Sequence, residues 1–252
     1  MGRVIVIANQ KGGVGKTTTA INLSACMAAA GKKTLLIDLD PQGNATSGLG
    51  VQKQSLQKSV YHALVDHVTL AEVVQPTLVD GLMIVPANKE LVGAEIELVD
   101  APEREYRLRR QAESVRDSYD FVFIDCPPSL GLLTLNGLVA ADGVLITLQC
   151  EYYALEGLSE LLHTIVLVRD KLNPRLRLQG VLLTMYQHTN LSKQVMDDVR
   201  AHLGQKVYET VIPRNVTLSE APSFGKPVIY YDLKSPGAQA YLALAREVAA
   251  RG

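Results

Sequence analysis

The sequence is poor in the features that mark secreted, metal-rich or membrane-spanning proteins. Its 252 residues include only three cysteines, Cys26, Cys126 and Cys150, with no Cys-x-x-Cys pair and no metal-ligand spacing. Such isolated thiols are typical of a reducing cytosol. No apolar run approaches the ~18 residues that a membrane-spanning helix needs. The first predicted strand starts so close to Met1 that a signal peptide does not fit before it. We therefore expect a cytoplasmic protein.

Internal repeats, low-complexity blocks and linkers rich in proline, glycine or serine are also absent. Hydrophobic residues make up 47% and charged residues 20% of the chain, which is ordinary for a globular protein with a full core. The five histidines are scattered, which argues against a transition-metal site. We expect one domain over residues 1–252, because this length fits one large α/β domain.

Charge is distributed unevenly along the chain. The net charge is −1, but residues 169–252 hold 12 Lys/Arg against 7 Asp/Glu, a balance of +5, which leaves −6 for residues 1–168. An anionic partner would therefore meet the C-terminal third. Residues 90–117 are dense in both charge signs, and we interpret them as a solvated helix surface with i,i+4 ion pairs.

Apolar, β-branched runs alternate with helix-like segments. The predicted strands cover residues 4–8, 34–37, 82–85, 121–124, 144–148 and 178–183. The predicted helices cover residues 17–30, 88–118, 155–172, 191–203 and 236–250. Several strands are continuously apolar, as expected when both faces of a parallel sheet are covered. The alternation predicts an α/β fold with a doubly wound, mostly parallel sheet and helices on both faces.

The segment NQKGGVGKTT, residues 9–18, has the composition and the context of a phosphate-binding loop, because it connects the first predicted strand to the first predicted helix. Glycines let backbone N–H groups converge on phosphate oxygens, and the helix adds its positive N-terminal end. In this pattern Lys16 reaches the β/γ-phosphates and Thr17 ligates Mg²⁺. Gln10 replaces the first glycine of the usual pattern, with Lys11 beside it. The predicted nucleotide-binding residues are Lys11, Gly12, Gly13, Val14, Gly15, Lys16, Thr17 and Thr18.

Aspartates follow two of the predicted strands. Asp38 and Asp40 come after residues 34–37, and Asp125 comes after residues 121–124. A strand-end aspartate lies at the carboxyl edge of the sheet, where open α/β sheets bind ligands. Asp125 fits the aspartate that holds Mg²⁺ through water in phosphate-loop ATPases. Each site alone is equally consistent with a turn residue, but together with the phosphate loop they favour a functional role.

These residues are sufficient for ATP hydrolysis. Phosphoryl transfer needs cations on the developing charge and a group that orients the attacking water. Lys16, Lys11 and Mg²⁺ can supply the cations, and Asp38 or Asp40 can orient the water. The expected ligands are therefore ATP or ADP and Mg²⁺.

Three stretches together resemble a known family. Residues 11–17 resemble the deviant Walker A motif of the ParA/MinD ATPases, and residues 38–46 resemble their next motif. Residues 212–216 and 219–227 are similar to the Soj branch, the chromosomal ParA proteins. The similarity extends from about Val4 to Val248, and it implies the fold of a P-loop NTPase.

The resemblance also implies roles for individual residues. In this family two ATP-bound subunits form a sandwich dimer, in which the lysine that matches Lys11 reaches the partner's nucleotide and helps catalysis. Asp38 would join Asp125 in holding Mg²⁺ through water, and Asp40 matches the aspartate that positions the attacking water. Pro213 and Asn215 match positions near the adenine. Such dimers bind double-stranded DNA without sequence preference, and a ParB-type partner stimulates hydrolysis. The family would place this protein on the nucleoid, in segregation of a chromosome or plasmid.

Non-specific DNA binding depends mainly on Lys and Arg contacts to phosphates. The candidates in the basic C-terminal third are Lys193, Arg200, Lys206, Arg214 and Lys226. Arg214 ranks first, since it matches an arginine implicated in DNA binding in the family. Relatives often carry basic residues where this chain has His188-Thr189 and Thr217, which indicates weaker or redistributed contacts.

Two other functions remain open from the sequence. A MinD-like regulator that cycles on membranes would need a basic amphipathic C-terminal helix. The last predicted helix has one basic and one acidic residue between Ala238 and Val248, so we expect no membrane partner. A metabolic enzyme or reductase on the same fold, such as the nitrogenase iron protein, would need suitably placed cysteine thiolates. Cys126 and Cys150 both follow predicted strands, which leaves a bridging cluster possible.

Overall fold

We describe a computed structural model of the chain, which covers residues 2–66, 68–151 and 154–251. In these residues eight strands form one sheet in the order β3-β4-β2-β5-β1-β6-β7-β8. Only the β3–β4 pair is antiparallel. The strands are β1 (Arg3–Ala8), β2 (Thr34–Asp38), β3 (Gln75–Pro76), β4 (Leu82–Val85), β5 (Phe121–Asp125), β6 (Gly143–Gln149), β7 (Arg177–Tyr186) and β8 (Val207–Pro213).

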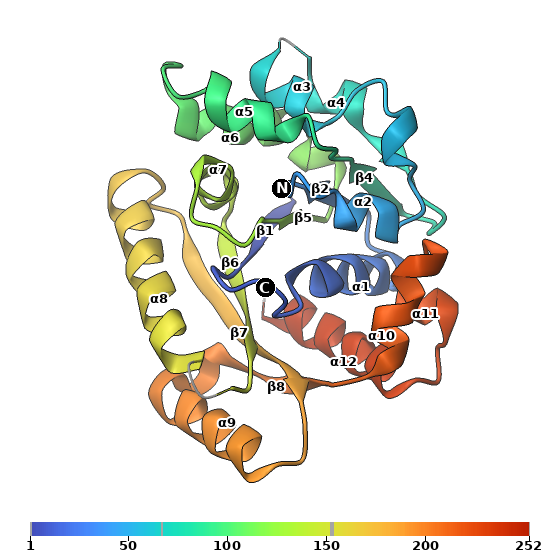
Figure 1. Ribbon diagram of the computed structural model, residues 1–252, viewed down its shortest axis with the longest axis vertical. Coiled ribbons are helices and arrows are strands. Elements are labelled where there is room, and N and C mark those ends of the chain that lie inside the picture. Colours follow the sequence, from blue (N-terminus) through green and yellow to red (C-terminus); the bar gives the residue numbers. More distant parts are fainter. Residues whose placement is uncertain (1, 67, 152–153, 252) are drawn as a thin grey trace.

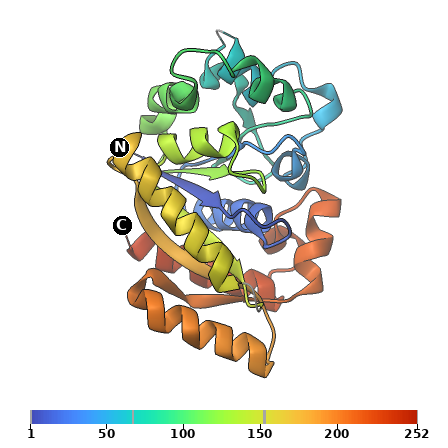
Figure 2. The same cartoon turned by 60° about the vertical axis from the view of Figure 1, so that its left-hand side comes forward.

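Helices cover both faces of this sheet (Figure 1). One face carries α3 (Val60–Val65), α4 (Leu70–Val73), α5 (Leu91–Glu97), α6 (Arg107–Val115), α7 (Leu132–Ala140), α8 (Ala154–Lys171) and α9 (Asn190–Leu203). The other face carries α1 (Lys16–Ala29), α2 (Asn44–Gly48), α10 (Val216–Glu220), α11 (Val228–Tyr231) and α12 (Pro236–Ala250). Figure 2 shows the same layers from a second direction, with α8 crossing in front of the sheet. The expected doubly wound, mostly parallel α/β fold is confirmed.

The central strand explains why the strand sequences are apolar without alternation. Val4 and Val6 of β1 pack into the core under α3 to α9, whereas Ile5 and Ile7 pack into the core around α1 and α12. Successive side chains of a strand point to opposite faces, so a strand that is covered on both faces needs apolar residues at every position.

The six strands expected from the sequence all form, and each differs by at most a few residues at its ends. Two strands were missed. β3 is only two residues long, and β8 carries Glu209 and Thr210 in mid-strand and ends in Pro213, so its sequence does not read as a buried run. Helix α7 was missed as well, because nine mostly apolar residues show no helical period.

The single helix expected over residues 88–118 is wrong. The structure has α5, then a 3₁₀ turn at Arg104–Tyr106, then α6 and a second 3₁₀ turn at Arg116–Ser118. The chain bends at Pro102 and Glu103. The φ of Glu103 is 52°, which lies in the left-handed region. Proline cannot continue a helix, and a left-handed residue reverses the backbone's course.

Candidate nucleotide site

The phosphate loop leaves β1 at the centre of the sheet and enters α1. Gly13 and Gly15 have φ values of 73° and 83°, which favour glycine, and Gly15 directly precedes the first residue of α1. Two buried threonines anchor the loop. The Thr184 hydroxyl of β7 donates to the Val14 carbonyl (2.9 Å), and Asn9 Nδ2 donates to the Thr147 carbonyl of β6 (2.6 Å). The loop is therefore anchored to two neighbouring strands, β6 and β7.

Lys16 is buried within this loop, and its Nζ donates to the Lys11 carbonyl (2.8 Å). Burial lowers the pKa of Lys16, while the nearby Asp125 carboxylate acts in the opposite direction. An ammonium held at a glycine-rich loop is suited to phosphate oxygens.

A cavity of about 400 Å³ opens in front of the loop. Its lining brings together the loop, the residues after β2, the loop after β5 and the end of β7. These residues are Gly12, Gly13, Gly15, Lys16, Thr17, Thr18, Asp40, Gln42, Asn44, Pro128 and Met185. Six of the eight predicted loop residues thus meet Asp40 in one cavity, whereas Lys11 and Val14 do not line it. Sequence reasoning missed Met185, whose φ of 51° marks an uncommon backbone conformation that no sequence pattern indicated.

A second cavity, of about 220 Å³, lies beside the first and shares Gly15, Thr18 and Met185 with it. Pro213, Arg214 and Asn215 line it from the end of β8, so the structure brings both predicted adenine-side residues next to the phosphate loop. Asn215 Oδ1 is buried and accepts no hydrogen bond from the residues that the structure describes. An unpaired amide oxygen suits a donor such as the exocyclic amine of adenine.

Asp38 and Asp125 face each other in register on the neighbouring strands β2 and β5. Asp38 Oδ2 accepts from the Thr46 main-chain N (2.8 Å) and hydroxyl (2.7 Å). Burial raises the pKa of Asp38 to about 6, although these hydrogen bonds act to lower it. Thr46 lies in α2 and is itself buried, so this short helix holds Asp38 in place.

Asp125 is fully buried, and neither of its carboxylate oxygens has a hydrogen-bond partner among the described residues. Burial and then the neighbouring Asp38 raise its pKa well above the ordinary value, whereas the Thr17 hydroxyl lowers it. Two orphaned carboxylate oxygens beside a threonine hydroxyl fit a hydrated Mg²⁺. Within the described ranges no three His, Cys, Asp or Glu side chains converge as a metal cage.

Asp40 reaches the phosphate side of the cavity. Its main-chain N donates to Asp38 Oδ1 (3.2 Å), and its Oδ1 accepts from the main-chain N of Gln42 (2.9 Å). These bonds fix the side chain and leave its other oxygen free for a water molecule. From the residues alone, either Asp38 or Asp40 could orient the attacking water. In the structure Asp40 lines the cavity, whereas Asp38 is fully buried.

Lys11 behaves differently from the rest of the loop. Its side chain lines neither cavity and is exposed, with Nζ 2.5 Å from Glu151 Oε2. Glu151 follows β6, and its other oxygen accepts from Gln149 Nε2 (2.6 Å). Lys11 therefore points away from the nucleotide cavity of its own subunit.

The five basic residues predicted to contact DNA do not form one patch. Arg214 lies at the carboxyl edge, where its main-chain N donates to the Tyr186 carbonyl (3.0 Å), and Lys193 lies in the first turn of α9 at the same edge. Lys206 lies at the opposite edge, with Nζ 3.3 Å from the Leu178 carbonyl near the start of β7.

Of the remaining two candidates, Arg200 lies apart from Arg214. Arg200, in the last turn of α9, contacts Glu209 near the start of β8, with 3.6 Å between Nη2 and Oε2. Lys226 lies between the 3₁₀ turn Ala221–Phe224 and α11.

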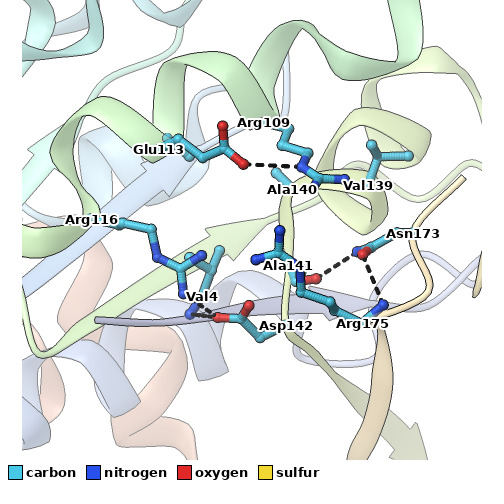
Figure 3. A pocket seen from close by; sticks show the side chains of 11 residues that line it. Val4, Arg109, Glu113, Arg116, Val139, Ala140, Ala141, Asp142, Asn173 and Arg175 are labelled. Atoms are coloured by element: carbon cyan, nitrogen blue, oxygen red, sulfur yellow. Dashed lines mark hydrogen bonds and ion pairs between the residues drawn. The ribbon is translucent and has the colours of Figure 1, made fainter. Parts of the chain in front are cut away.

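A third, small cavity lies at the amino edge of the sheet (Figure 3). Its volume of about 10 Å³ holds about one water molecule. The Arg116 guanidinium donates to the Gly2 carbonyl and to Asp142 Oδ2, both at 2.8 Å, and the same carboxylate accepts from the Val4 main-chain N (2.9 Å). These bonds tie the start of β1 to the helical layer, so the role is structural.

The cysteines do not support a bridging cluster. Cys126 and Cys150 are both buried, and burial raises the pKa of Cys150 to about 11 and that of Cys126 further. Cluster ligation by two subunits needs thiolates at a shared surface. No helix in the described part of the chain is long and apolar enough to cross a bilayer, and Tyr241, Leu244 and Val248 of α12 are buried in the core.

A glycine loop between a strand and a helix, with carboxylates on adjacent strand ends, defines a P-loop nucleotide hydrolase. A family model described as an AAA domain matches residues 2–178. The sporulation initiation inhibitor protein Soj of Bacillus subtilis is 58% identical over 253 residues and covers 100% of both chains. The chromosome partitioning protein ParA of Myxococcus xanthus is 56% identical over 100% of this chain and 89% of its own.

Solved structures agree with this similarity. A cobyrinic acid a,c-diamide synthase from Mycobacterium smegmatis, with bound ADP and magnesium, is 40% identical, with a TM-score of 0.86 over 98% of this chain and 93% of its own. The cell division ATPase MinD of Pyrococcus furiosus is 27% identical, with a TM-score of 0.83 over 100% of both chains. The chain belongs to the ParA/Soj family of partition ATPases, and it is a Mg²⁺-dependent ATPase.

Proposed function

We propose that this ATPase drives DNA partition as a nucleotide-gated dimer. ATP binding joins two subunits into a sandwich dimer, the dimer binds double-stranded DNA on the nucleoid without sequence preference, and hydrolysis separates the subunits. A ParB-type partner stimulates hydrolysis, and the cycle moves a chromosome or plasmid. The observation that carries this proposal is the position of Lys11, which points out of its own nucleotide cavity while the rest of the loop lines it.

Within one subunit, Lys16 binds the β/γ-phosphates in place of the Lys11 carbonyl that it now contacts. Thr17 would hold Mg²⁺ directly and Asp125 would hold its water ligands, whereas Asp38, whose two oxygens already accept from Asp40 and Thr46, would add its charge behind them. When bound, the ion neutralises charge on the phosphates. Asp40, fixed by Asp38 and Gln42, orients the attacking water with its free oxygen.

Between subunits, Lys11 binds the nucleotide of the partner subunit. Lys11 can leave its ion pair with Glu151 at little cost in free energy, because an exposed ion pair stabilises by only ~0.2–1 kcal/mol. A triphosphate offers a lysine stronger, charge-assisted hydrogen bonds. Lys11 therefore leaves Glu151 when a partner subunit presents ATP, which makes the site complete only in the dimer.

DNA binding is linked to the nucleotide through the end of β8. Arg214 stands between Pro213 and Asn215, which line the proposed adenine cavity. A shift of this segment on ATP binding would move Arg214 directly. Lys193 lies at the same edge of the sheet, whereas Lys206 lies far from the nucleotide and could supply only a contact independent of it.

The decisive experiment measures binding to random-sequence duplex DNA with ADP, with ATP and with a non-hydrolysable ATP analogue. We expect binding with ATP and the analogue, little with ADP, and no sequence preference. Lys16→Ala is the control, since it should remove the ATP dependence. Absent or nucleotide-independent DNA binding would contradict the proposal and favour a metabolic enzyme, the class to which the name of the M. smegmatis protein belongs. ATP-dependent binding to liposomes would instead favour a MinD-like regulator.

A further inference from the structure

The outer side of α5 exposes apolar residues that no described element covers. Val92 is 50%, Ile96 72% and Val99 51% exposed. Val92 and Ile96 lie four residues apart on α5, and Val99 lies in the turn just after the helix, while Leu91 and Ala94 are buried. We call Val92, Ile96 and Val99 the α5 stripe. Contiguous apolar patches on a soluble surface mark interaction sites more often than scattered single residues do.

Carboxylates surround the α5 stripe. Residues 89–103 contain one lysine against five acidic residues, a balance of −4. Glu103 pairs with Arg110. The other four have no ion-pair partner among the residues that the structure describes, and they are Glu90, Glu95, Glu97 and Asp100. The sequence suggested a solvated helix surface with i,i+4 ion pairs over residues 90–117. Within these residues the structure has one such pair, Arg109–Glu113 on α6. The α5 stripe is instead an apolar surface with an uncompensated negative border.

This surface continues toward the nucleotide cavity. Glu95 of α5 lies against Gly131 in the loop after β5. The approach is so close that a Cβ atom at Gly131 would be only 2.6 Å from Glu95 Oε1. The preceding residue, Leu130, is 38% exposed, and Pro128 of the same loop lines the phosphate side of the cavity. A partner on α5 would therefore touch a loop that contacts the nucleotide site.

We propose that the α5 stripe docks a basic amphipathic helix of another protein. An amphipathic helix buries an apolar side-chain row against such a stripe, and its lysines or arginines would meet the four carboxylates that lack an ion pair, of which Glu90 and Glu97 accept hydrogen bonds from the neutral Asn88 and Tyr61. Other occupants are disfavoured by charge. In a contact between two copies, the net charge of −4 of residues 89–103 would face the same charge of −4 on the second copy. DNA and an anionic lipid surface would also be repelled by this negative charge. This docking surface goes beyond the partition cycle proposed above, because it would bind its partner whether or not ATP is hydrolysed.

The probe is a fluorescent synthetic helix of leucine and lysine, with leucines at positions i, i+3, i+4 and i+7, and its binding is followed by anisotropy. We expect saturable binding that weakens as salt rises. Ile96→Ser should weaken binding about tenfold or more, because it removes a large apolar side chain that the docked helix would bury. Leu191→Ser on α9, also an exposed apolar residue at 45%, is the matched control and should bind as the unaltered protein does.

A second pair of measurements tests the charge requirement. The double variant Glu95→Gln/Asp100→Asn should bind the leucine–lysine helix more weakly and with a flatter salt dependence. A helix of leucine and glutamate should not bind. The proposal is wrong if Ile96→Ser binds the probe as tightly as the Leu191→Ser control, or if the leucine–glutamate helix binds equally well. Sedimentation in which Ile96→Ser abolishes self-association would also overturn it, by assigning the stripe to contacts between copies.

Discussion

Asp38 and Asp125 lie opposite each other on adjacent parallel strands, yet of their two carboxylates only that of Asp38 accepts hydrogen bonds from the residues that the structure describes. Thr46 gives Asp38 both a main-chain and a hydroxyl donor, while the two oxygens of Asp125 face the Thr17 side of the phosphate loop without a partner. The carboxylate of Asp38 is therefore held by hydrogen bonds within the fold, whereas that of Asp125 is available to the water shell of a cation.

The Thr46 hydroxyl is the first residue to test. Thr46→Val removes the hydroxyl that donates to Asp38 and accepts from the Ala87 main-chain N (2.9 Å). Because both groups are buried, we expect the free energy of unfolding to fall by about 1–3 kcal/mol, measured by urea denaturation. Thr46→Ser keeps the hydroxyl and should lose much less. Equal stability of the two variants would show that this hydrogen bond does not hold Asp38.

Lys16 and Lys11 form a matched pair for separating binding within a subunit from binding between subunits. Lys16→Ala should weaken ATP binding at least about tenfold, because a charged hydrogen bond contributes ~1.5–3 kcal/mol. Lys11→Ala should leave ATP affinity of the monomer nearly unchanged and abolish ATP-dependent dimerisation. Fluorescent-nucleotide titration and size-exclusion chromatography with ATP give the two readouts. Unchanged affinity in Lys16→Ala would refute its role, and normal dimerisation of Lys11→Ala would refute the contact between subunits.

Asp40→Ala should stop turnover without preventing ATP-driven dimerisation. The carboxylate orients water in the proposed mechanism, so its loss should slow phosphate release by about 10²–10⁴-fold. Phosphate release is measured beside the dimer fraction with ATP, since an intact dimer shows that the cavity still binds nucleotide. Hydrolysis at the normal rate would remove Asp40 from the mechanism.

Arg214→Glu should weaken DNA binding on all sequences, most strongly at low salt, and should reduce the salt dependence. Lys206→Glu makes the same charge change at the opposite edge of the sheet and should have little effect on ATP-gated binding. Gel-shift titrations at two salt concentrations compare the variants. A larger defect in Lys206→Glu would place the DNA surface at the amino edge instead.

The sequence alone determined the sheet class and the phosphate loop, because both depend on residues close together in the chain. The apolar runs specify buried strands, and the glycines with Lys16 and Thr17 specify backbone geometry and charge within ten residues. The aspartates after β2 and β5 could also be located in advance, since parallel strands bring their carboxyl ends to one edge.

Only the tertiary structure decided which groups meet across long distances in the chain. Thr184 holds Val14, Met185 joins the two cavities, and Asn215 lines the second cavity together with Gly15 and Thr18. No sequence period indicates such contacts, because they depend on strand order. The break at Pro102 and Glu103 likewise replaced one long helix by α5 and α6 and exposed the α5 stripe. Lys11 was recognised from its place in the loop, but its direction, out of its own cavity and onto Glu151, follows from β6 packing beside β1.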